Sequence, residues 1–139
     1  MTNEALCQAA IEAMKKAYVP YSGYRVGAAL LDSEEILTQG CNIENASYSP
    51  TICAERTAFF KAISSRETEA LPHFLKIAVA GGKGGVIEGA FPPCGVCRQV
   101  MSEFCGDDFE ILVIQSEEPL RYDTYRLPEL LPLRFSPEY

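Results

Sequence analysis

The sequence predicts an α/β fold in which helices pack in layers against one sheet. Short apolar segments of strand character alternate along the chain with longer segments of helical periodicity, as in layered α/β folds. The length of 139 residues and the apolar fraction of 47% are sufficient for one hydrophobic core. Because no linker or internal repeat interrupts the pattern, we expect residues 1–139 to form a single domain.

The first half of the chain begins with one helix and two strands. Residues 4–18 place apolar side chains mostly at helical spacing and stop before Pro20, which predicts a helix. Residues 25–32 are mostly apolar and predict a buried strand, and residues 35–40 predict a second strand after a turn. We expect the polar residues 41–48 to form a loop.

A second helix is expected after this loop. Ser49 and Pro50 are suited to the N-cap and the first helical position, so they predict a helix that continues through Cys53 to Ile63. Residues 75–80 are apolar throughout except for Lys76 and predict a third strand.

The remaining elements follow a glycine-rich segment. Residues 81–91 lack the residue order of a phosphate-binding loop, and we interpret them as a flexible connection. Pro93 opens another predicted helix. Two further strands and a short helix are expected at residues 109–115, 121–125 and 128–131.

Charge and composition limit the possible partners. Twelve basic against nineteen acidic side chains give a net charge of -7, which disfavours binding to nucleic acid and is compatible with a small neutral substrate. No segment is typical of a signal peptide or a membrane span, so we expect a cytoplasmic protein without a membrane partner. In that compartment the six cysteines are expected to be thiols or metal ligands instead of disulfides.

Three cysteines and one glutamate form the most informative group. Cys53 and Glu55 stand two residues apart, and Cys94 and Cys97 follow Pro93 in the second half of the chain. Three thiolates beside a carboxylate predict Zn²⁺ with an open fourth position and a nearby proton carrier. The same order of residues is a described signature of zinc-dependent deaminases of cytosine and adenine.

The predicted ligands lie at the starts of helices. Unpaired N–H groups and the positive end of the helix dipole favour thiolate over thiol there. Cys94 and Cys97, three residues apart, lie on one helical face and can bind one ion together. Cys53 and Glu55 are two residues apart and would point in different directions within a helix. Both can reach one ion only if it lies beyond the helix terminus. We therefore expect the site where two helix N-termini converge.

Two arginines directly follow the motifs. Three thiolates on Zn²⁺ leave a net negative charge, which opposes activation of a bound water. We hypothesise that Arg56 and Arg98 donate hydrogen bonds to the ligand sulfurs and so withdraw charge from the metal.

A purely structural zinc is the alternative from cysteine spacing alone, with Cys41 or His73 as a fourth ligand. Glu55 next to a ligand argues against it. His73 is more simply interpreted as an ordinary strand-end residue, and Cys7, Cys41 and Cys105 as small buried hydrophobic residues.

Several segments in the same order resemble the short, homotetrameric, zinc-dependent cytidine deaminases, and the resemblance extends over nearly the whole chain. It implies a three-layer α/β/α sandwich around a mixed, roughly five-stranded sheet. The resemblance is carried by residues 40–48, 53–58 and 93–99, with support from residues 20–22, 26–30, 130–132 and Phe135.

The resemblance also implies the reaction. The enzyme would be a hydrolase of pyrimidine salvage that converts cytidine and 2′-deoxycytidine to uridine and 2′-deoxyuridine plus ammonia. One Zn²⁺ per chain would be held by Cys53, Cys94 and Cys97. Glu55 would move a proton from the zinc-bound water to ring N3 as hydroxide attacks C4, and would then protonate the departing amino group.

Further residues would contact the substrate if the family pattern holds. Asn42 and Glu44 would bind the ribose hydroxyls, and the backbone at Ala54 would meet the base. Tyr24, where relatives carry phenylalanine, would line the nucleoside, while Tyr48 and Phe135 would enter a neighbouring subunit's site in a homotetramer. The carbonyl before Pro93, which would receive the substrate amino group, belongs here to Pro92.

Other functions are weighed against this one. A related zinc deaminase could act on another amino-heterocycle, such as blasticidin or a nucleotide, but residues 41–48 contain no basic side chain for a phosphate. A non-catalytic, zinc-stapled binding module is the alternative from a different class. Turnover of cytidine separates the enzyme from the binding module.

Overall fold

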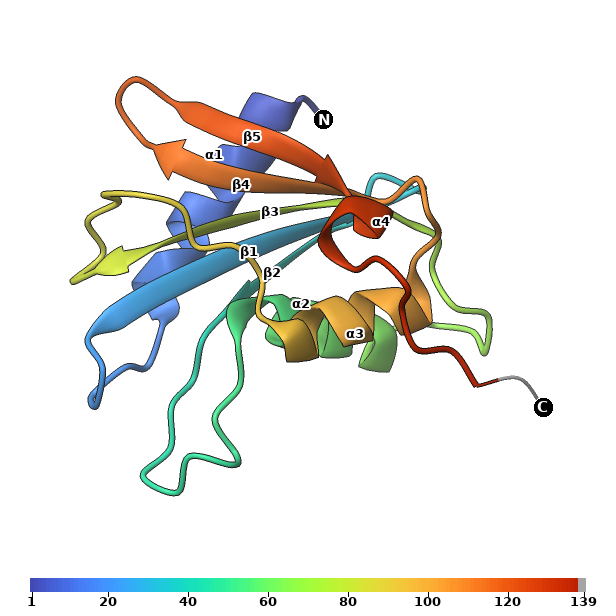
Figure 1. The fold of residues 1–139 in the computed structure, drawn as a ribbon, viewed down its shortest axis with the longest axis horizontal. Coiled ribbons are helices and arrows are strands. Elements are labelled where there is room, and N and C mark those ends of the chain that lie inside the picture. Colours follow the sequence, from blue (N-terminus) through green and yellow to red (C-terminus); the bar gives the residue numbers. More distant parts are fainter. Residues whose placement is uncertain (138–139) are drawn as a thin grey trace.

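The computed structural model describes residues 1–137, which form five strands and four α-helices, with one 3-10 turn at Met14–Lys16 (Figure 1). The prediction of alternating helices and strands is confirmed. In chain order the elements are α1 (Asn3–Ala13), β1 (Tyr24–Asp32), β2 (Leu37–Cys41), α2 (Ala54–Ser64), β3 (Phe74–Lys83), α3 (Gly95–Phe104), β4 (Glu110–Ser116), β5 (Arg121–Arg126) and α4 (Leu127–Leu130).

The strands form one mixed sheet in the order β2-β1-β3-β4-β5. Only β3 and β4 run parallel, because α3 lies in the connection that crosses between them. The other neighbouring strands are antiparallel. A mixed, five-stranded sheet was expected from the resemblance, and this prediction is confirmed.

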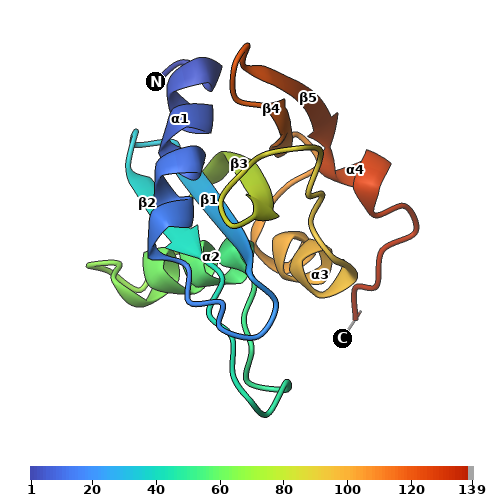
Figure 2. The same ribbon diagram turned by 90° about the vertical axis from the view of Figure 1, so that its left-hand side faces the viewer.

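Helices cover both faces of the sheet. α1 lies on one face, and α2 and α3 lie on the other (Figures 1 and 2). Successive residues of β1 point to opposite faces of the sheet, because side chains alternate along a strand. Leu30 packs in the core on the α2 side, and Leu31 packs in the core on the α1 side. The predicted three-layer α/β/α sandwich is therefore confirmed.

The start of α2 differs from the prediction. Ser49 and Pro50 lie in a turn, and Cys53 is the N-cap of a helix that begins at Ala54. Ile43 and Ile52 exchange backbone hydrogen bonds of 3.1 and 3.0 Å, which keeps residues 44–51 in a loop. Tertiary pairing thus overrides the local Ser-Pro signal.

The glycine-rich residues 81–91 also differ from the prediction of a flexible connection. Residues 81–83 continue strand β3, and the following loop folds back over it. A Cβ at Gly81 would lie 2.7 Å from Cγ of Phe91, and one at Gly82 would overlap the Val86 carbonyl. These glycines allow a close approach of the loop that fixes the position of Phe91 before the second cysteine motif.

Gly40 sets the distance between β2 and the N-terminal turn of α2. A Cβ at this position would lie 2.5 Å from the backbone nitrogen of Ala58 and closer still to the Ala54 carbonyl oxygen. We expect Gly40→Ala to lower the free energy of unfolding by about 2 kcal/mol through overpacking. Thermal unfolding measures this, and Gly89→Ala is the matched control because nothing lies within 4 Å of its Cβ. An equal effect of the two substitutions would contradict the close-approach argument.

Among residues 1–137, no helix has the length and apolar character needed to cross a membrane.

Candidate functional site

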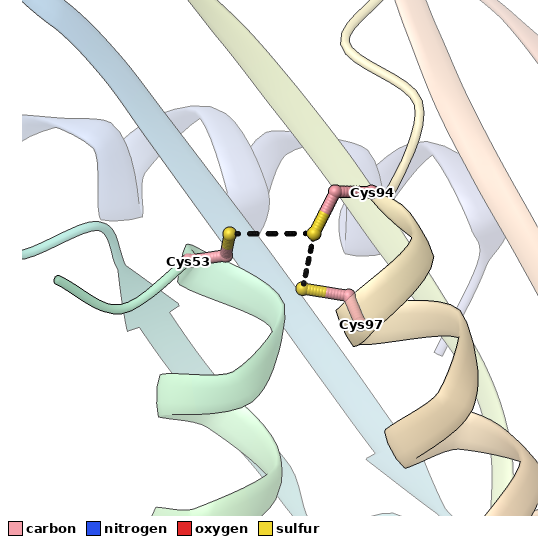
Figure 3. A group of neighbouring side chains, drawn as sticks. All are labelled: Cys53, Cys94 and Cys97. Carbon is pink, nitrogen blue, oxygen red and sulfur yellow. Dashed lines mark hydrogen bonds between the residues drawn. The ribbon is translucent and has the colours of Figure 1, made fainter. Parts of the chain in front are cut away.

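Three cysteine sulfurs meet where two helices begin. Cys53 is the N-cap of α2, Cys94 is the N-cap of α3, and Cys97 lies in the first turn of α3. The Sγ atoms of Cys53 and Cys94 are 3.7 Å apart, and those of Cys94 and Cys97 are 3.6 Å apart (Figure 3). All three lie within 4.8 Å of one another, at the convergence of helix N-termini that the sequence predicts.

The spacing of the sulfurs fits a tetrahedral metal ion. Two thiolates bound to Zn²⁺ at about 2.3 Å with a tetrahedral angle lie about 3.8 Å apart. The separations of 3.7 and 3.6 Å from Cys94 to the other two sulfurs are close to this value. Soft sulfur ligands in a tetrahedral arrangement favour zinc over the hard cations Mg²⁺ and Ca²⁺.

The described part of the chain supplies no fourth ligand to this group. Cys41 and His73, the candidates for a closed structural site, do not belong to the cluster. His73 is exposed just before strand β3, and its carbonyl accepts a hydrogen bond from the Ser33 amide. A three-ligand protein site leaves one tetrahedral position for water or substrate, as in catalytic zinc sites.

Arg56 contacts the sulfur cluster. Its Nη2 donates to the Cys53 sulfur at 3.3 Å, and its buried Nε has no hydrogen-bond partner among the described residues. Hydrogen bonds from Cys97, Arg56 and Cys94 lower the pKa of Cys53 to about 5 despite burial. The cluster is thus arranged to hold a thiolate at Cys53.

Arg98 does not follow the same pattern. The expected hydrogen bond to a ligand sulfur is not made, because its guanidinium donates to the carbonyl oxygens of Pro93 and Leu130, both at 2.7 Å. Among residues 1–137, its side chain makes no hydrogen bond to a cluster sulfur. The side chain reaches past the cysteines to the backbone, a direction that the sequence position alone does not reveal.

Glu55 lies in the first turn of α2 and is only 4% exposed. Burial raises the pKa of its carboxyl to about 7, and the negative charge of Cys53 contributes in the same direction. A carboxyl with a pKa near neutrality both accepts and releases protons at physiological pH. Its neighbour Ala54 is fully buried.

The predicted ribose ligands lie in the loop that precedes α2, where Asn42 is tied to the start of β1 and Glu44 to the segment before β1. Asn42 accepts from the Val26 amide at 2.9 Å and donates to the Tyr24 carbonyl at 2.8 Å. Glu44 accepts from the amides of Tyr21 and Ser22 at 3.1 Å each and from the Ser22 hydroxyl. These hydrogen bonds lower the pKa of Glu44, with the Ser22 hydroxyl as the largest cause, so the carboxylate is held ionised.

The aromatic candidates fall into two groups. Tyr24 is 43% exposed, and its ring centroid lies 5.8 Å from that of Phe91. Tyr48 and Phe135 are more exposed, at 80% and 62%. Tyr48 belongs to the loop between β2 and α2, which extends away from the body of the molecule (Figure 2).

Sequence reasoning missed Phe91 as a neighbour of Tyr24. The two rings meet only because residues 84–91 fold back along β3. The sequence offers one signal for this contact. Several glycines without the order of a phosphate-binding loop are followed by an aromatic residue and two prolines.

Comparison with known proteins supports the interpretation of the site. Residues 1–113, which include every member of the sulfur cluster and Glu55, match the family model described as the cytidine and deoxycytidylate deaminase zinc-binding region. The chain belongs to the cytidine deaminase family. The resemblance inferred from the sequence motifs is thereby confirmed, together with the prediction of an enzyme of this family.

Individual cytidine deaminases are similar over nearly their whole length. The protein of Sporosarcina psychrophila is 42% identical over 99% of this chain and 94% of its own length, and that of Halalkalibacterium halodurans is 42% identical over 99% and 97%. The crystal structure of cytidine deaminase from Burkholderia pseudomallei superposes with a TM-score of 0.84 at 40% identity, covering 97% of this chain and 100% of that one. Sequence and fold therefore agree on the same family.

Proposed function

We propose that this chain catalyses the hydrolytic deamination of cytidine and 2′-deoxycytidine, releasing ammonia and forming uridine or 2′-deoxyuridine. The observation that carries the proposal is the cluster of Cys53, Cys94 and Cys97 without a fourth protein ligand among the described residues, close in sequence to a buried glutamate. The similar cytidine deaminases support this substrate class. Residues 1–139 would act as one catalytic domain of the pyrimidine salvage route.

The three sulfurs would hold one Zn²⁺ per chain. When bound, this ion supplies Lewis-acid activation of the water that attacks C4 of the pyrimidine ring. Arg56 would offset the negative charge of the three thiolates through its contact with Cys53.

Glu55 is the proton carrier in this proposal. Its carboxylate takes a proton from the attacking water, gives it to ring N3, and then protonates the amino group that leaves as ammonia. The pKa of about 7 suits both directions of transfer, because neither protonation state is strongly disfavoured near neutral pH.

The remaining substrate contacts come from the loop before α2 and from aromatic side chains. Asn42 and Glu44 would bind ribose hydroxyls, and the fixed orientation of the Glu44 carboxylate by Ser22 supports a preformed acceptor. Tyr24 would line the nucleoside, and the backbone at Ala54 and the carbonyl of Pro92 would meet the base. The loop at residues 41–48 carries no basic residue, so nucleosides are preferred to nucleotides in this proposal.

We also propose that the working form is a homotetramer in the cytoplasm, with sites shared between subunits. The exposure of Tyr48 and Phe135 in one chain supports their contribution to a neighbouring site. The net charge of -7 argues against nucleic acid as a partner.

Turnover of defined substrates by the zinc-loaded protein tests the function. Ultraviolet absorbance and ammonia release are followed with cytidine, 2′-deoxycytidine, their 5′-monophosphates and blasticidin. We expect both nucleosides to be converted and the 5′-monophosphates to react at least about tenfold more slowly, since the loop at residues 41–48 offers a phosphate no cation. Faster conversion of blasticidin than of cytidine would favour the related deaminase. Zinc-loaded protein that converts none of them would favour the binding module.

Arg56→Gln is expected to lower turnover of cytidine by about 10- to 100-fold, the range found when an outer hydrogen bond to a metal ligand is removed. Glutamine retains a donor but loses the positive charge beside the Cys53 sulfur. Arg66→Gln is the matched control, because the exposed Arg66 donates to the backbone carbonyl of Ile63, away from the cluster. Equal turnover by the Arg56 and Arg66 variants would contradict the charge-offset role.

A further inference from the structure

Arg98 joins two segments that are far apart in sequence. From the first turn of α3, its Nε donates to the Pro93 carbonyl and its Nη1 donates to the Leu130 carbonyl, each at 2.7 Å. Both distances are short for hydrogen bonds from nitrogen to oxygen, as expected for a charged donor. The side chain is partly buried, which limits competition from water.

The first of these contacts acts on residues 92–94, directly before α3. Pro92 and Pro93 have no backbone N–H group, so this stretch cannot be fixed through hydrogen bonds that it donates. The Pro93 carbonyl is directly followed by the cluster cysteine Cys94 and directly preceded by the Pro92 carbonyl. A charged donor on Pro93 therefore orients both neighbours.

The second contact acts on the C-terminal segment. Leu130 is the last residue of α4, and the carbonyls at a helix C-terminus lack partners within the helix. Gln99, next to Arg98, donates to the carbonyl of Phe135 at 3.4 Å. Two adjacent residues of α3 thus hold residues 130–135 against the helix that carries Cys97.

We propose that Arg98 is a positioning residue that couples the C-terminal segment, residues 130–135, to the cluster segment, residues 92–94. Movement of either segment changes the hydrogen bond that Arg98 makes to the other. The arrangement of Cys94 and the Pro92 carbonyl thereby depends on the placement of the tail that carries Phe135. The catalytic consequence rests on the proposed function, whereas the coupling itself does not.

The geometry requires arginine. The planar guanidinium presents several donors in a fixed arrangement, so it bridges two carbonyls at once. Lysine keeps the positive charge but concentrates its donors on one flexible ammonium group. Arg98→Lys is therefore expected to lose the coupling while retaining the charge, and Arg98→Met removes both.

Hydrogen–deuterium exchange of the zinc-loaded, full-length protein tests the coupling without reference to activity. In both Arg98 variants we expect faster exchange at residues 94–97 and at residues 127–135 together, with α1 unchanged, and faster release of zinc to a chelator. Gln99→Ala is the matched control, because Gln99 contacts the tail but not Pro93. Because Arg98 still holds the Leu130 carbonyl in this variant, we expect faster exchange only at residues 133–135, beyond that contact, and none at residues 94–97.

Kinetics of the same variants provide the second measurement. We expect Arg98→Lys to lower kcat/KM for cytidine by about 10- to 100-fold, with changes in both kcat and KM, since a small misplacement of substrate-contacting groups has effects of this size. Faster exchange in only one of the two segments, or in neither, would overturn the proposed coupling. If the wild-type protein does not convert cytidine but exchange in the Arg98 variants still increases in both segments together, the proposed function is refuted and the coupling stands.

Discussion

Glu55→Gln is expected to reduce turnover of cytidine by at least about 10³-fold while zinc remains bound. Proton transfer by a positioned side chain typically contributes 10²- to 10⁴-fold to a rate, and Glu55 would serve more than one transfer in the proposed reaction. Glutamine has nearly the same shape as glutamate but cannot accept and return a proton. Because Glu55 is not part of the sulfur cluster, its replacement should leave the metal ligands in place.

Steady-state kinetics and zinc content per chain, measured on the same preparations, check this prediction. Glu103→Gln is the matched control, since Glu103 lies exposed on α3. Burial disfavours the charged carboxylate, which is why the pKa of Glu55 is raised. The amide of the glutamine variant is neutral and does not carry this cost. We therefore expect thermal unfolding of the Glu55 variant at or above the wild-type temperature. Turnover within tenfold of wild type, with zinc bound, would show that another group carries the proton.

The layered fold was predictable because its signals are local. The apolar run in β1 and the helical spacing in α1 each indicate a buried face through a known periodicity. β1 begins one residue before its expected start, whereas α1 begins one residue early and ends at Ala13, five residues before its expected end. The convergence of two helix N-termini on the cysteines was also predictable. It followed from the chemistry that stabilises thiolates, not from any single spacing.

The parts that could not be predicted depend on contacts between distant residues. The start of α2 is set by pairing of Ile43 with Ile52, which displaces the local signal at Ser49 and Pro50. The direction of the Arg98 side chain depends on a carbonyl 32 residues away. Sequence position identifies Arg98 as a neighbour of a ligand, but only the fold shows which acceptors lie within its reach.

Contacts around the loop at residues 41–48 illustrate the same limit. Family resemblance singled out Asn42 and Glu44, yet it did not reveal that both side chains bind the chain segment before or at the start of β1. Ser22 is the clearest example, because its amide and hydroxyl both donate to Glu44 across 22 residues of sequence. The orientation of the proposed ribose ligands is therefore a property of two loops together.

Removal of one cluster sulfur is expected to have the second large effect. If Cys53, Cys94 and Cys97 share a zinc-binding free energy of about 10 kcal/mol, Cys97→Ala weakens binding by about 3 kcal/mol, or 10²- to 10³-fold. Cys97 is the buried member of the cluster, so solvent cannot easily replace its sulfur without disturbing α3. Turnover should fall with zinc occupancy.

Zinc content after dialysis, affinity in a chelator competition and thermal unfolding measure this effect. Because a metal that binds only the folded state stabilises it in proportion to the logarithm of affinity, the variant should unfold about 10 °C lower in saturating zinc. Cys41→Ser and His73→Ala are the matched controls, since neither residue belongs to the cluster. Both are expected to retain zinc and turnover. Loss of zinc in either control would identify a fourth protein ligand, and a site closed in that way has no position for the attacking water.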